Sequence, residues 1–354
     1  MRFRHLISTC AAFSAFALIA AVFAPATAQT PVKPPPIKIT LDGALTGANA
    51  PFVVAEDRGF YRAEGIDVSI DVNAAQPDAL SRVAAGTAEI TLADINAVAK
   101  FRDHTPGAPL KAVFMVYNKP PYAVIARKSR GIAHPRDLDG KRVGAPPNEM
   151  ASLFLPAFAK LNDIDVTKVK IENIAAAVRE PMLAAGQIDA VIGTSISAYL
   201  NLKERGVPLD DVVILQMADY GLLVYGDAIV VNSSFAAEHP EAVKKFLRAY
   251  LKGLKETLKT PARAIESVLK RNESARKDIE SERLRMVIRD NILTEEVQTN
   301  GLGGVDPERL ARAADLLTQS LKAKAKIEPS DLFDASFLPP VAERRIAPTK
   351  PGAG

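Results

Sequence analysis

The chain has 354 residues, with 45 Lys or Arg against 41 Asp or Glu, one cysteine (Cys10) and no tryptophan. This near balance of charge gives no support for binding to nucleic acid, and a single cysteine excludes an intrachain disulfide. The length suggests two domains, and after residue 28 no apolar run approaches the roughly 20 residues that a membrane-spanning helix requires.

The first residues have the pattern of a secretory signal peptide. A basic start at residues 1–5 is followed by an apolar stretch at residues 11–23 and by the small-x-small step Ala26-Thr27-Ala28. Cys10 precedes the apolar stretch, whereas a lipid-acceptor cysteine would follow it. We therefore expect cleavage after Ala28, a mature protein without thiols, and a location in the periplasm.

Short β-branched runs alternate with helical patterns after a proline-rich lead-in at residues 31–36. The period of the apolar residues predicts strands at residues 37–41, 66–72 and 89–92, and helices at residues 50–61 and 78–85. Strands that alternate with helices in this way are typical of a parallel sheet covered by helices.

The same series recurs about 100 residues later, as an internal repeat. VAAGTAEI at residues 83–90 aligns with LAAGQIDA at residues 183–190, and GIDV at residues 65–68 aligns with DIDV at residues 163–166. The Ala-Ala-Gly step alone indicates only a helix C-cap. Because several elements match in order at nearly one offset, the repeat predicts two lobes with one plan.

Open α/β sheets bind ligands outside the carboxyl ends of their strands, where helices begin. A cleft between two such lobes would be bordered by residues 42–51, 74–78, 93–97, 145–152, 174–180 and 194–199. The chain should cross between the lobes near residues 117–122 and 218–221. Long amphipathic helices, expected at residues 240–258, 262–270, 281–292 and 307–322, would complete the first lobe.

This organisation gives a set of expected domain boundaries. They are a signal peptide at residues 1–28, a first lobe at residues 37–120 that continues, mainly helical, at residues 222–340, a second lobe at residues 121–221, and a flexible tail at residues 341–354.

Several stretches are shared with a known family. They are AEDRGFY at residues 55–61 with EGIDV at residues 64–68, DLDGKRVG at residues 137–144, and PEAV at residues 240–243 with Phe246 and Ala249-Tyr250. In them the chain resembles the ABC-transporter solute-binding proteins for sulfonates, nitrate, taurine and thiamine-pyrimidine precursors. The resemblance covers nearly the whole mature chain. It implies an α/β protein of the type II periplasmic-binding-protein fold, with two α/β lobes joined by hinge strands, and a permease of an ABC importer as partner.

The resemblance implies that the loops bordering the cleft select the solute. In the loop at residues 145–152, two prolines remove backbone donors, and Glu149 places a carboxylate at a helix start. Asp42 and Asp94 add negative charge from the first lobe, so we expect an amino-heterocycle, a vitamin precursor or an amine rather than a sulfonate or nitrate. In the alternative, Glu149 and Asp94 only cap helices, and Arg179 either binds a ligand carboxylate or pairs with Glu180 or Glu149.

Tyrosines lie near both expected crossings, where their rings would either sandwich a flat ligand or pack the hinge. The thiamine-precursor branch of the family typically has a Trp soon after the Asp of the first strand, and this chain has none. The predicted ligand-binding residues are Asp42, Asn49, Asp94, Asn96, Tyr117, Asn148, Glu149, Ser152, Arg179, Ser195 and Tyr220.

Catalytic signatures are weak. The sequence GTSIS at residues 193–197 misses the Gly-x-Ser-x-Gly elbow, and His104, His134 and His239 show no metal-ligand spacing. We therefore expect no catalytic residue, metal or cofactor, and a monomeric receptor that closes its lobes on a small solute. Two alternatives stay open: an exported or cofactor-biosynthetic enzyme on the same fold, and a sensor-type binding protein.

Overall fold

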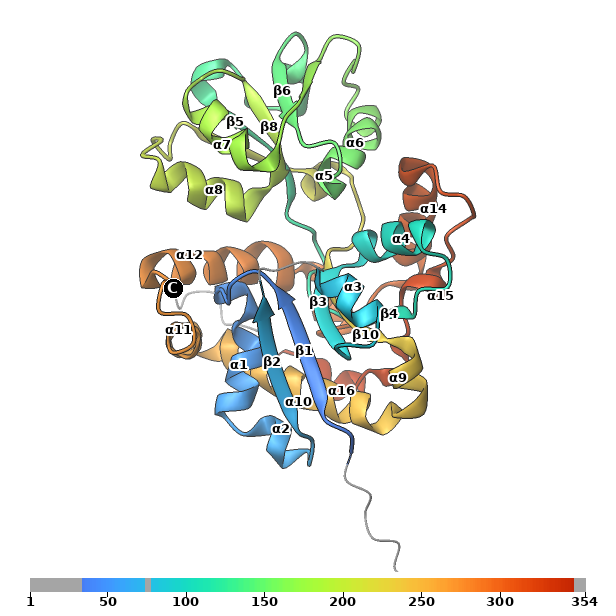
Figure 1. Cartoon of the computed structure of the whole chain (residues 1–354). Coiled ribbons are helices and arrows are strands. Elements are labelled where there is room, and N and C mark those ends of the chain that lie inside the picture. The colour runs from blue at the N-terminus through green and yellow to red at the C-terminus, as the bar shows by residue number, and fades with distance from the viewer. Residues whose placement is uncertain (1–33, 74–77, 347–354) are drawn as a thin grey trace, which may run out of the picture. The chain divides into compact units, whose positions relative to one another are not determined.

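The computed structural model describes residues 34–73 and 78–346, which form two five-stranded sheets covered by helices (Figure 1). The predicted signal peptide lies outside the described residues. The first sheet has the strand order β2-β1-β3-β10-β4. Its strands are β1 (Ile37–Asp42), β2 (Val68–Asn73), β3 (Ile90–Asp94), β4 (Leu110–Met115) and β10 (Asp227–Asn232).

The second sheet has the strand order β7-β6-β8-β5-β9. Its strands are β5 (Tyr122–Arg127), β6 (Arg142–Ala145), β7 (Lys170–Asn173), β8 (Ala190–Thr194) and β9 (Val212–Gln216). The sheet of β1 with its helices is called the first lobe below, and the sheet of β5 with its helices the second lobe.

The two sheets share one plan, as the internal repeat predicts. In each, three strands are parallel, with β1 or β6 between the other two. The prediction of parallel sheets is wrong for β10 and β5, which run antiparallel to their neighbours. Each of these strands follows a crossing and enters its sheet in the reverse direction. The sequence analysis missed β10, because a short apolar run cannot be told from a buried helical segment by its period.

Helices of the first lobe begin with η1 (Gly47–Asn49) after β1 and end with the short α16. They are α1 (Ala50–Asp57), α2 (Phe60–Ala63), α3 (Ala79–Ala84), α4 (Ile95–His104), α9 (Ser233–Glu238), α10 (Pro240–Lys259), α11 (Pro261–Leu269), α12 (Lys277–Met286), the π-helical η6 (Val287–Ile292), α13 (Glu295–Asn300), α14 (Pro307–Leu321), α15 (Pro329–Leu332), η7 (Ala335–Phe337) and α16 (Val341–Arg344).

Helices of the second lobe follow its strands in the sequence, and the longest of them, α8, has 10 residues. They are η2 (Lys128–Arg130), η3 (Pro135–Leu138), α5 (Met150–Leu153), α6 (Leu155–Leu161), η4 (Ala176–Val178), α7 (Arg179–Ala184), α8 (Ser195–Glu204) and η5 (Met217–Tyr220).

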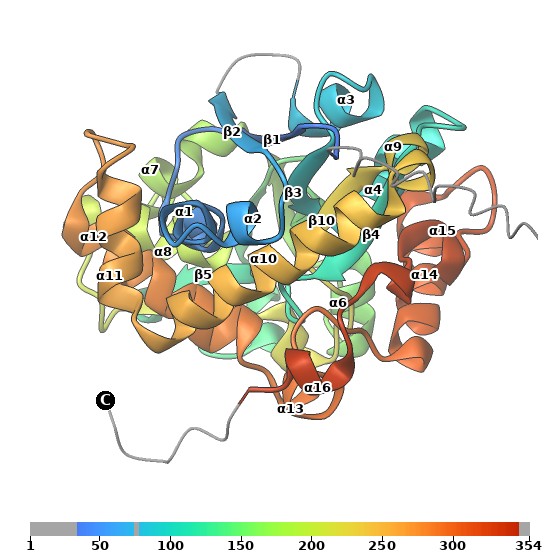
Figure 2. The same ribbon diagram turned by 90° about the horizontal axis from the view of Figure 1, so that it is seen from below.

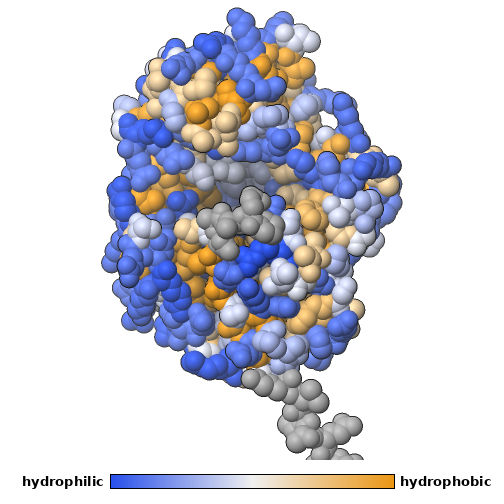
Figure 3. All heavy atoms as spheres, in the orientation of Figure 1, coloured by the Kyte–Doolittle hydropathy of each residue, from blue (hydrophilic) through white to orange (hydrophobic). Residues whose placement is uncertain are grey.

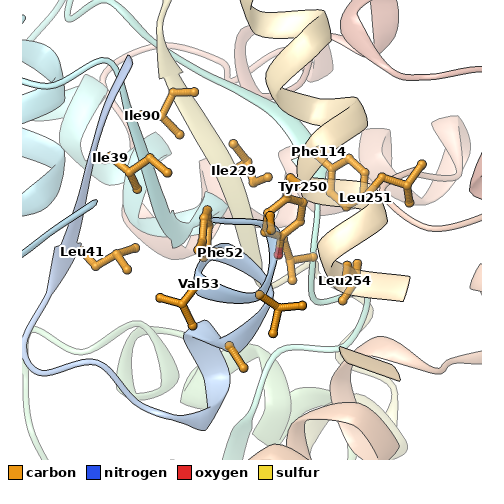
Figure 4. Close-up of a cluster of buried hydrophobic side chains, with 14 of the residues drawn as sticks. Ile39, Leu41, Phe52, Val53, Ile90, Phe114, Ile229, Tyr250, Leu251 and Leu254 are labelled. Atoms are coloured by element: carbon orange, nitrogen blue, oxygen red, sulfur yellow. The ribbon is translucent and has the colours of Figure 1, made fainter. Parts of the chain in front are cut away.

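Helices α1 and α10 pack against each other and against the first sheet (Figures 2 and 4). The ring of Tyr250 on α10 lies 4.7 Å from that of Phe52 on α1 and 5.5 Å from that of Phe114 on β4, measured between centroids. The helices approach closely at Gly253, where a Cβ atom would lie 2.4 Å from the carbonyl oxygen of Pro51. Burial of these apolar side chains is the main contribution to the stability of this core.

The chain passes between the sheets twice. Residues 116–121 lead from β4 to β5 and residues 217–226 lead from β9 to β10, which agrees with the predicted crossings. The crossings are hydrogen-bonded to each other at their first-sheet ends. The carbonyl oxygen of Asp227 accepts from the N–H groups of Val116 and Tyr117 at 2.9 Å, and the N–H of Gly226 donates to the carbonyl oxygen of Tyr117 at 3.0 Å. The lobe boundaries at residues 120/121 and 221/222 stay a prediction.

The expectation of a flexible tail from residue 341 is wrong for residues 341–346. Helix α16 occupies residues 341–344, and the buried Arg344 donates hydrogen bonds to the carbonyl oxygens of Asn300 at 2.7 Å and Leu302 at 2.9 Å. Residues 347–354 lie outside the described part of the chain.

The face drawn in Figure 3 is hydrophilic over most of its area, with apolar residues in separate patches. Within residues 34–73 and 78–346, no helix is both long and apolar enough to cross a membrane.

Candidate functional site

A hydrogen-bonded cluster joins the end of β3 to the start of β5. Asp94 caps helix α4, and its Oδ1 accepts from the backbone N–H and from Nδ2 of Asn96, both at 2.8 Å. The hydroxyl of Tyr122 donates to the other carboxylate oxygen of Asp94. Nδ2 of Asn96 also reaches the Tyr122 hydroxyl oxygen at 3.0 Å and the carbonyl oxygen of Tyr225 at 2.6 Å. The cluster therefore ties the first sheet to the second beside both crossings.

The sequence analysis left two roles open for Asp94, a helix cap and a carboxylate of the cleft. One carboxylate oxygen caps α4, while the other accepts from a residue of the other sheet. Burial raises the pKa of Asp94, and the hydrogen bond from Tyr122 opposes this rise. Burial, and then the negative charge of Asp94, raise the pKa of Tyr122 well above its ordinary value. The phenol therefore keeps its proton and directs it to Asp94.

The sequence analysis missed Asp227, the first residue of β10. Asp227 is paired directly with Asp94 in the antiparallel β3–β10 ladder, so both side chains lie on one face of the sheet. Burial, and then the charge of Asp94, raise the pKa of Asp227 to about 7. The apolar run at residues 228–231 is the signal that could have indicated a strand here, and with it a carboxylate at the strand start.

In the second lobe, the buried Arg179 is held by two carboxylates. Its Nη1 lies 2.7 Å from Glu149 Oε2, and its Nε lies 2.8 Å from Glu180 Oε1. Nη1 also donates to the carbonyl oxygen of Ile192 at 3.3 Å. The guanidinium lies against Gly193, where a Cβ atom would be 2.4 Å from Nη1. Both pairings left open for Arg179 are therefore present, and its charge is already compensated.

Glu149 occupies the N-cap of α5, but its side chain makes no capping hydrogen bond and pairs with Arg179 instead. The negative charge expected from Glu149 is therefore largely compensated, because the guanidinium of Arg179 lies between the carboxylates of Glu149 and Glu180. These three residues together carry a single net negative charge.

Two hydroxyl groups at the helix starts of the second lobe have no hydrogen-bond partner in the described part of the chain. They are the buried Oγ atoms of Ser152 on α5 and of Ser195 on α8. The exposed Asn148 contributes its carbonyl oxygen, which accepts from Nζ of Lys100 on α4 at 2.9 Å. This hydrogen bond is one of several further polar contacts between the lobes, which include the ion pair of Arg276 with Glu204.

Asp42 and Asn49 stabilise the loop region after β1. Oδ1 of the exposed Asp42 accepts from the N–H of Ala79 at 2.8 Å, and Oδ1 of Asn49 accepts from the N–H and hydroxyl of Thr46 at 3.2 and 3.1 Å. These contacts fix the backbone around η1 and the start of α3. The hydrogen bonds of the described residues do not connect either side chain with the Asp94 cluster.

The contacts of Tyr117 and Tyr220 fit the hinge-packing alternative. Tyr117 is buried in the apolar core of the first sheet. The ring of Tyr220 packs edge-on against Phe158 at 6.3 Å between centroids. The hydroxyl of Tyr225 donates to Oε1 of Glu296 at 2.6 Å, and the guanidinium of Arg309 lies 4.1 Å from the centre of its ring.

A cavity with a volume of about 720 Å³ lies among helices of the first lobe. Its walls are formed by α11, α12 and η6, and include Ile265, Leu284, Ile288 and Leu293. No predicted ligand-binding residue lines it. Within residues 34–73 and 78–346, no group of three or more His, Cys, Asp or Glu side chains is placed to hold a metal ion.

The structure thus brings Asp94 and Asn96 together with Tyr122 and Asp227, and separately pairs Glu149 with Arg179. The first cluster offers mainly hydrogen-bond acceptors, because the phenol proton of Tyr122 is directed to Asp94. Such an arrangement suits a ligand that supplies N–H or O–H donors.

Comparison with solved structures identifies the fold. The periplasmic aliphatic sulphonate binding protein SsuA from Escherichia coli superposes with a TM-score of 0.66, at 15% identity, over 85% of this chain and 97% of that chain. At this identity the likeness concerns the fold alone. The chain has the periplasmic-binding-protein fold with two α/β lobes joined by hinge strands, as the resemblance in the sequence implied.

Two curated relatives are similar in sequence. The riboflavin-binding protein RibY of Chloroflexus aurantiacus is 26% identical over 302 residues, which cover 82% of each chain. The 4-amino-5-hydroxymethyl-2-methylpyrimidine phosphate synthase of Legionella pneumophila is 30% identical over 219 residues, which cover 62% of this chain and 68% of that relative.

The family described as NMT1/THI5 like matches residues 47–264. The match covers more than half of the chain and includes most of both sheets. The chain therefore belongs to the NMT1/THI5-like family.

Proposed function

We propose that this protein is the periplasmic solute-binding receptor of an ABC importer and that it captures a small organic solute by lobe closure. The observation that carries the proposal is the hydrogen bond from Tyr122 to Asp94. It joins polar side chains from both sheets at the strand ends, beside the two crossings that would act as the hinge. A solute bound there would contact both lobes, and closure would add contacts from the second lobe.

The proposed solute is an amino-heterocycle, a vitamin precursor or an amine rather than a sulfonate or nitrate. Carboxylates at Asp94 and Asp227 repel an anion, and Arg179 is already paired with Glu149 and Glu180. The relative named as a riboflavin-binding protein supports a vitamin-like solute. Asp94, Asn96 and Tyr122 would bind the solute. Ser152 and Ser195 would add contacts from the second lobe.

Export and delivery complete the proposal. Residues 1–28 would direct the chain to the periplasm, where the monomeric receptor would hand its solute to a permease in the inner membrane. Hydrolysis of ATP would occur on another subunit of the importer, so the receptor itself needs no covalent chemistry.

A thermal-shift screen of residues 29–354 tests this function. The panel would contain sulfonates, nitrate, aromatic carboxylates, amines, nucleobases, vitamins and their precursors. A solute at 100 times its Kd adds about 2.7 kcal/mol to the free energy of unfolding, which raises Tm by several degrees. Small-angle scattering with each hit then measures closure. A stabilising solute that leaves the radius of gyration unchanged would contradict the receptor mechanism.

An enzyme of cofactor biosynthesis is a second candidate, because the Legionella pneumophila relative is named as a phosphate synthase. The two functions predict different fates for the bound molecule. A receptor returns its solute unchanged, whereas a synthase consumes it, so mass spectrometry of each hit after incubation with the protein separates them. Recovery of a new product would favour the enzyme.

A further inference from the structure

Two carboxylates lie opposite each other at the end of the first sheet, and no Lys or Arg of the described residues is paired with them. Asp227 on β10 pairs directly with Asp94 on β3. Like charges directly opposite each other destabilise a sheet, and a Lys or Arg beside them would relieve the repulsion. In the described residues, neither carboxylate forms an ion pair, and both residues stay partly accessible to solvent. No cationic side chain of the described residues therefore relieves the repulsion between the two carboxylates.

The groups that surround Asp227 are negative or neutral. Asp94 faces it from β3, and the phenols of Tyr122 at the start of β5, Tyr117 in the first crossing and Tyr250 on α10 are close enough for their ionisation to be opposed by its charge. Burial and the charge of Asp94 raise the pKa of Asp227 to about 7. The surroundings thus favour binding of a positive charge.

Asn96 adds an independent sign of a missing donor. Asn96 is fully buried. Its Nδ2 is within hydrogen-bond distance of Asp94 Oδ1, the Tyr122 hydroxyl and the carbonyl oxygen of Tyr225. Its Oδ1, on the same amide, has no hydrogen-bond partner among the described residues. A buried acceptor without a donor lowers the stability of the folded protein. An N–H group of a ligand placed beside it would offset this loss.

We propose, on the basis of the proposed function, that the solute is an organic cation whose protonated nitrogen group binds between Asp94 and Asp227. The group needs at least two N–H donors, as in an amidinium, an aminopyridinium or a primary ammonium. One donor serves the carboxylate of Asp227, which has no hydrogen-bond partner among the described residues, and the other serves the outer lone pairs of Asp94. The cation replaces the repulsion between the carboxylates by two charge-assisted hydrogen bonds.

Three probes of one shape and different charge test this inference. Benzamidinium is a cation with paired N–H donors, benzamide is its neutral analogue, and benzoate is the anion. At pH 8, titration calorimetry should show that benzamidinium binds at least tenfold more tightly than benzamide, and that benzoate does not bind. Asp227→Asn, which keeps the shape of the side chain, should lower the affinity for benzamidinium at least tenfold. Asp315→Asn, at an exposed position of α14, is the matched control and should leave the affinity unchanged.

The pH dependence of benzamidinium binding distinguishes a ligand-binding role of Asp227 from a purely structural one. Binding of benzamidinium should weaken as the pH falls from 8 to 5.5, because protonation of Asp227 removes its charge, and Asp227→Asn should remove most of this dependence. Equal affinity of the wild type and Asp227→Asn for benzamidinium, or tighter binding of benzoate, would overturn the inference. A neutral or anionic solute from the panel that closes the lobes would overturn it too, while the proposed function would stand.

Discussion

Replacement of Asp227 by Asn should make the protein more stable at neutral pH and leave its stability nearly unchanged at pH 4. The pKa of Asp227 is raised from 3.8 to about 7, first by burial and then by the charge of Asp94. The folded protein therefore holds the proton more tightly than the unfolded chain. Protonated Asp227 therefore contributes fully to the free energy of unfolding below pH 3.8, and this contribution is lost as the pH rises to about 7.

The magnitude comes from the size of this rise. Each tenfold change in proton affinity is worth about 1.4 kcal/mol, so the full rise corresponds to at most about 4 kcal/mol. Asp227 stays partly accessible to solvent, which screens its interaction with Asp94. We therefore expect a difference of about 2 kcal/mol in the free energy of unfolding between Asp227→Asn and the wild type at pH 8.

Urea unfolding of both proteins at several pH values between 4 and 8, followed by circular dichroism, measures this difference. The advantage of Asp227→Asn should grow as the pH rises and level off above pH 7, while Asp315→Asn should follow the wild type throughout. A difference that stays constant with pH, or that favours the wild type at pH 8, would show that folding does not raise the pKa of Asp227.

Three further substitutions test packing and polar contacts in the two lobes by urea unfolding. Gly193→Ala should lower the free energy of unfolding by about 1–3 kcal/mol, because its Cβ would lie 2.4 Å from Nη1 of Arg179; unchanged stability would contradict that contact. Glu280→Ala should lower it by about 1–3 kcal/mol, because the N–H of Gly47 loses its buried acceptor at 2.6 Å, and a neutral result would mean that water replaces the carboxylate. Phe52→Ala should lower it by about 3–5 kcal/mol through the cavity left beside α10, and a loss below 1 kcal/mol would show that this core repacks.

Local patterns were sufficient to predict the strands and helices of the repeated part of the fold. The glycines of the two Ala-Ala-Gly steps have the expected left-handed conformation, with φ of 70° at Gly86 and 69° at Gly186. The apolar period also predicted α10 and α14 to within a residue at each end. These features depend on neighbours in the sequence, which is why the sequence alone predicts them.

Long-range pairing explains what the sequence could not predict. β10 was missed because its place between β3 and β4 depends on strands more than 100 residues earlier. Asp227 was missed with it, since only the register of β10 places this residue opposite Asp94. The charge at Glu149 was overestimated for the same reason: Arg179, 30 residues later, neutralises it across the second lobe.

The acidic pair lies where both crossings meet the first sheet. The carboxylate of Asp227 faces Asp94, while its carbonyl oxygen accepts hydrogen bonds from Val116 and Tyr117 in the first crossing. The second crossing ends directly before the same residue, and Asp94 bonds to Tyr122, where the first crossing ends. A cation bound between the two carboxylates would therefore act on residues connected to both crossings. A ligand favours one arrangement of the lobes over another only if its contacts differ between the two arrangements, and contacts beside both crossings would differ in this way.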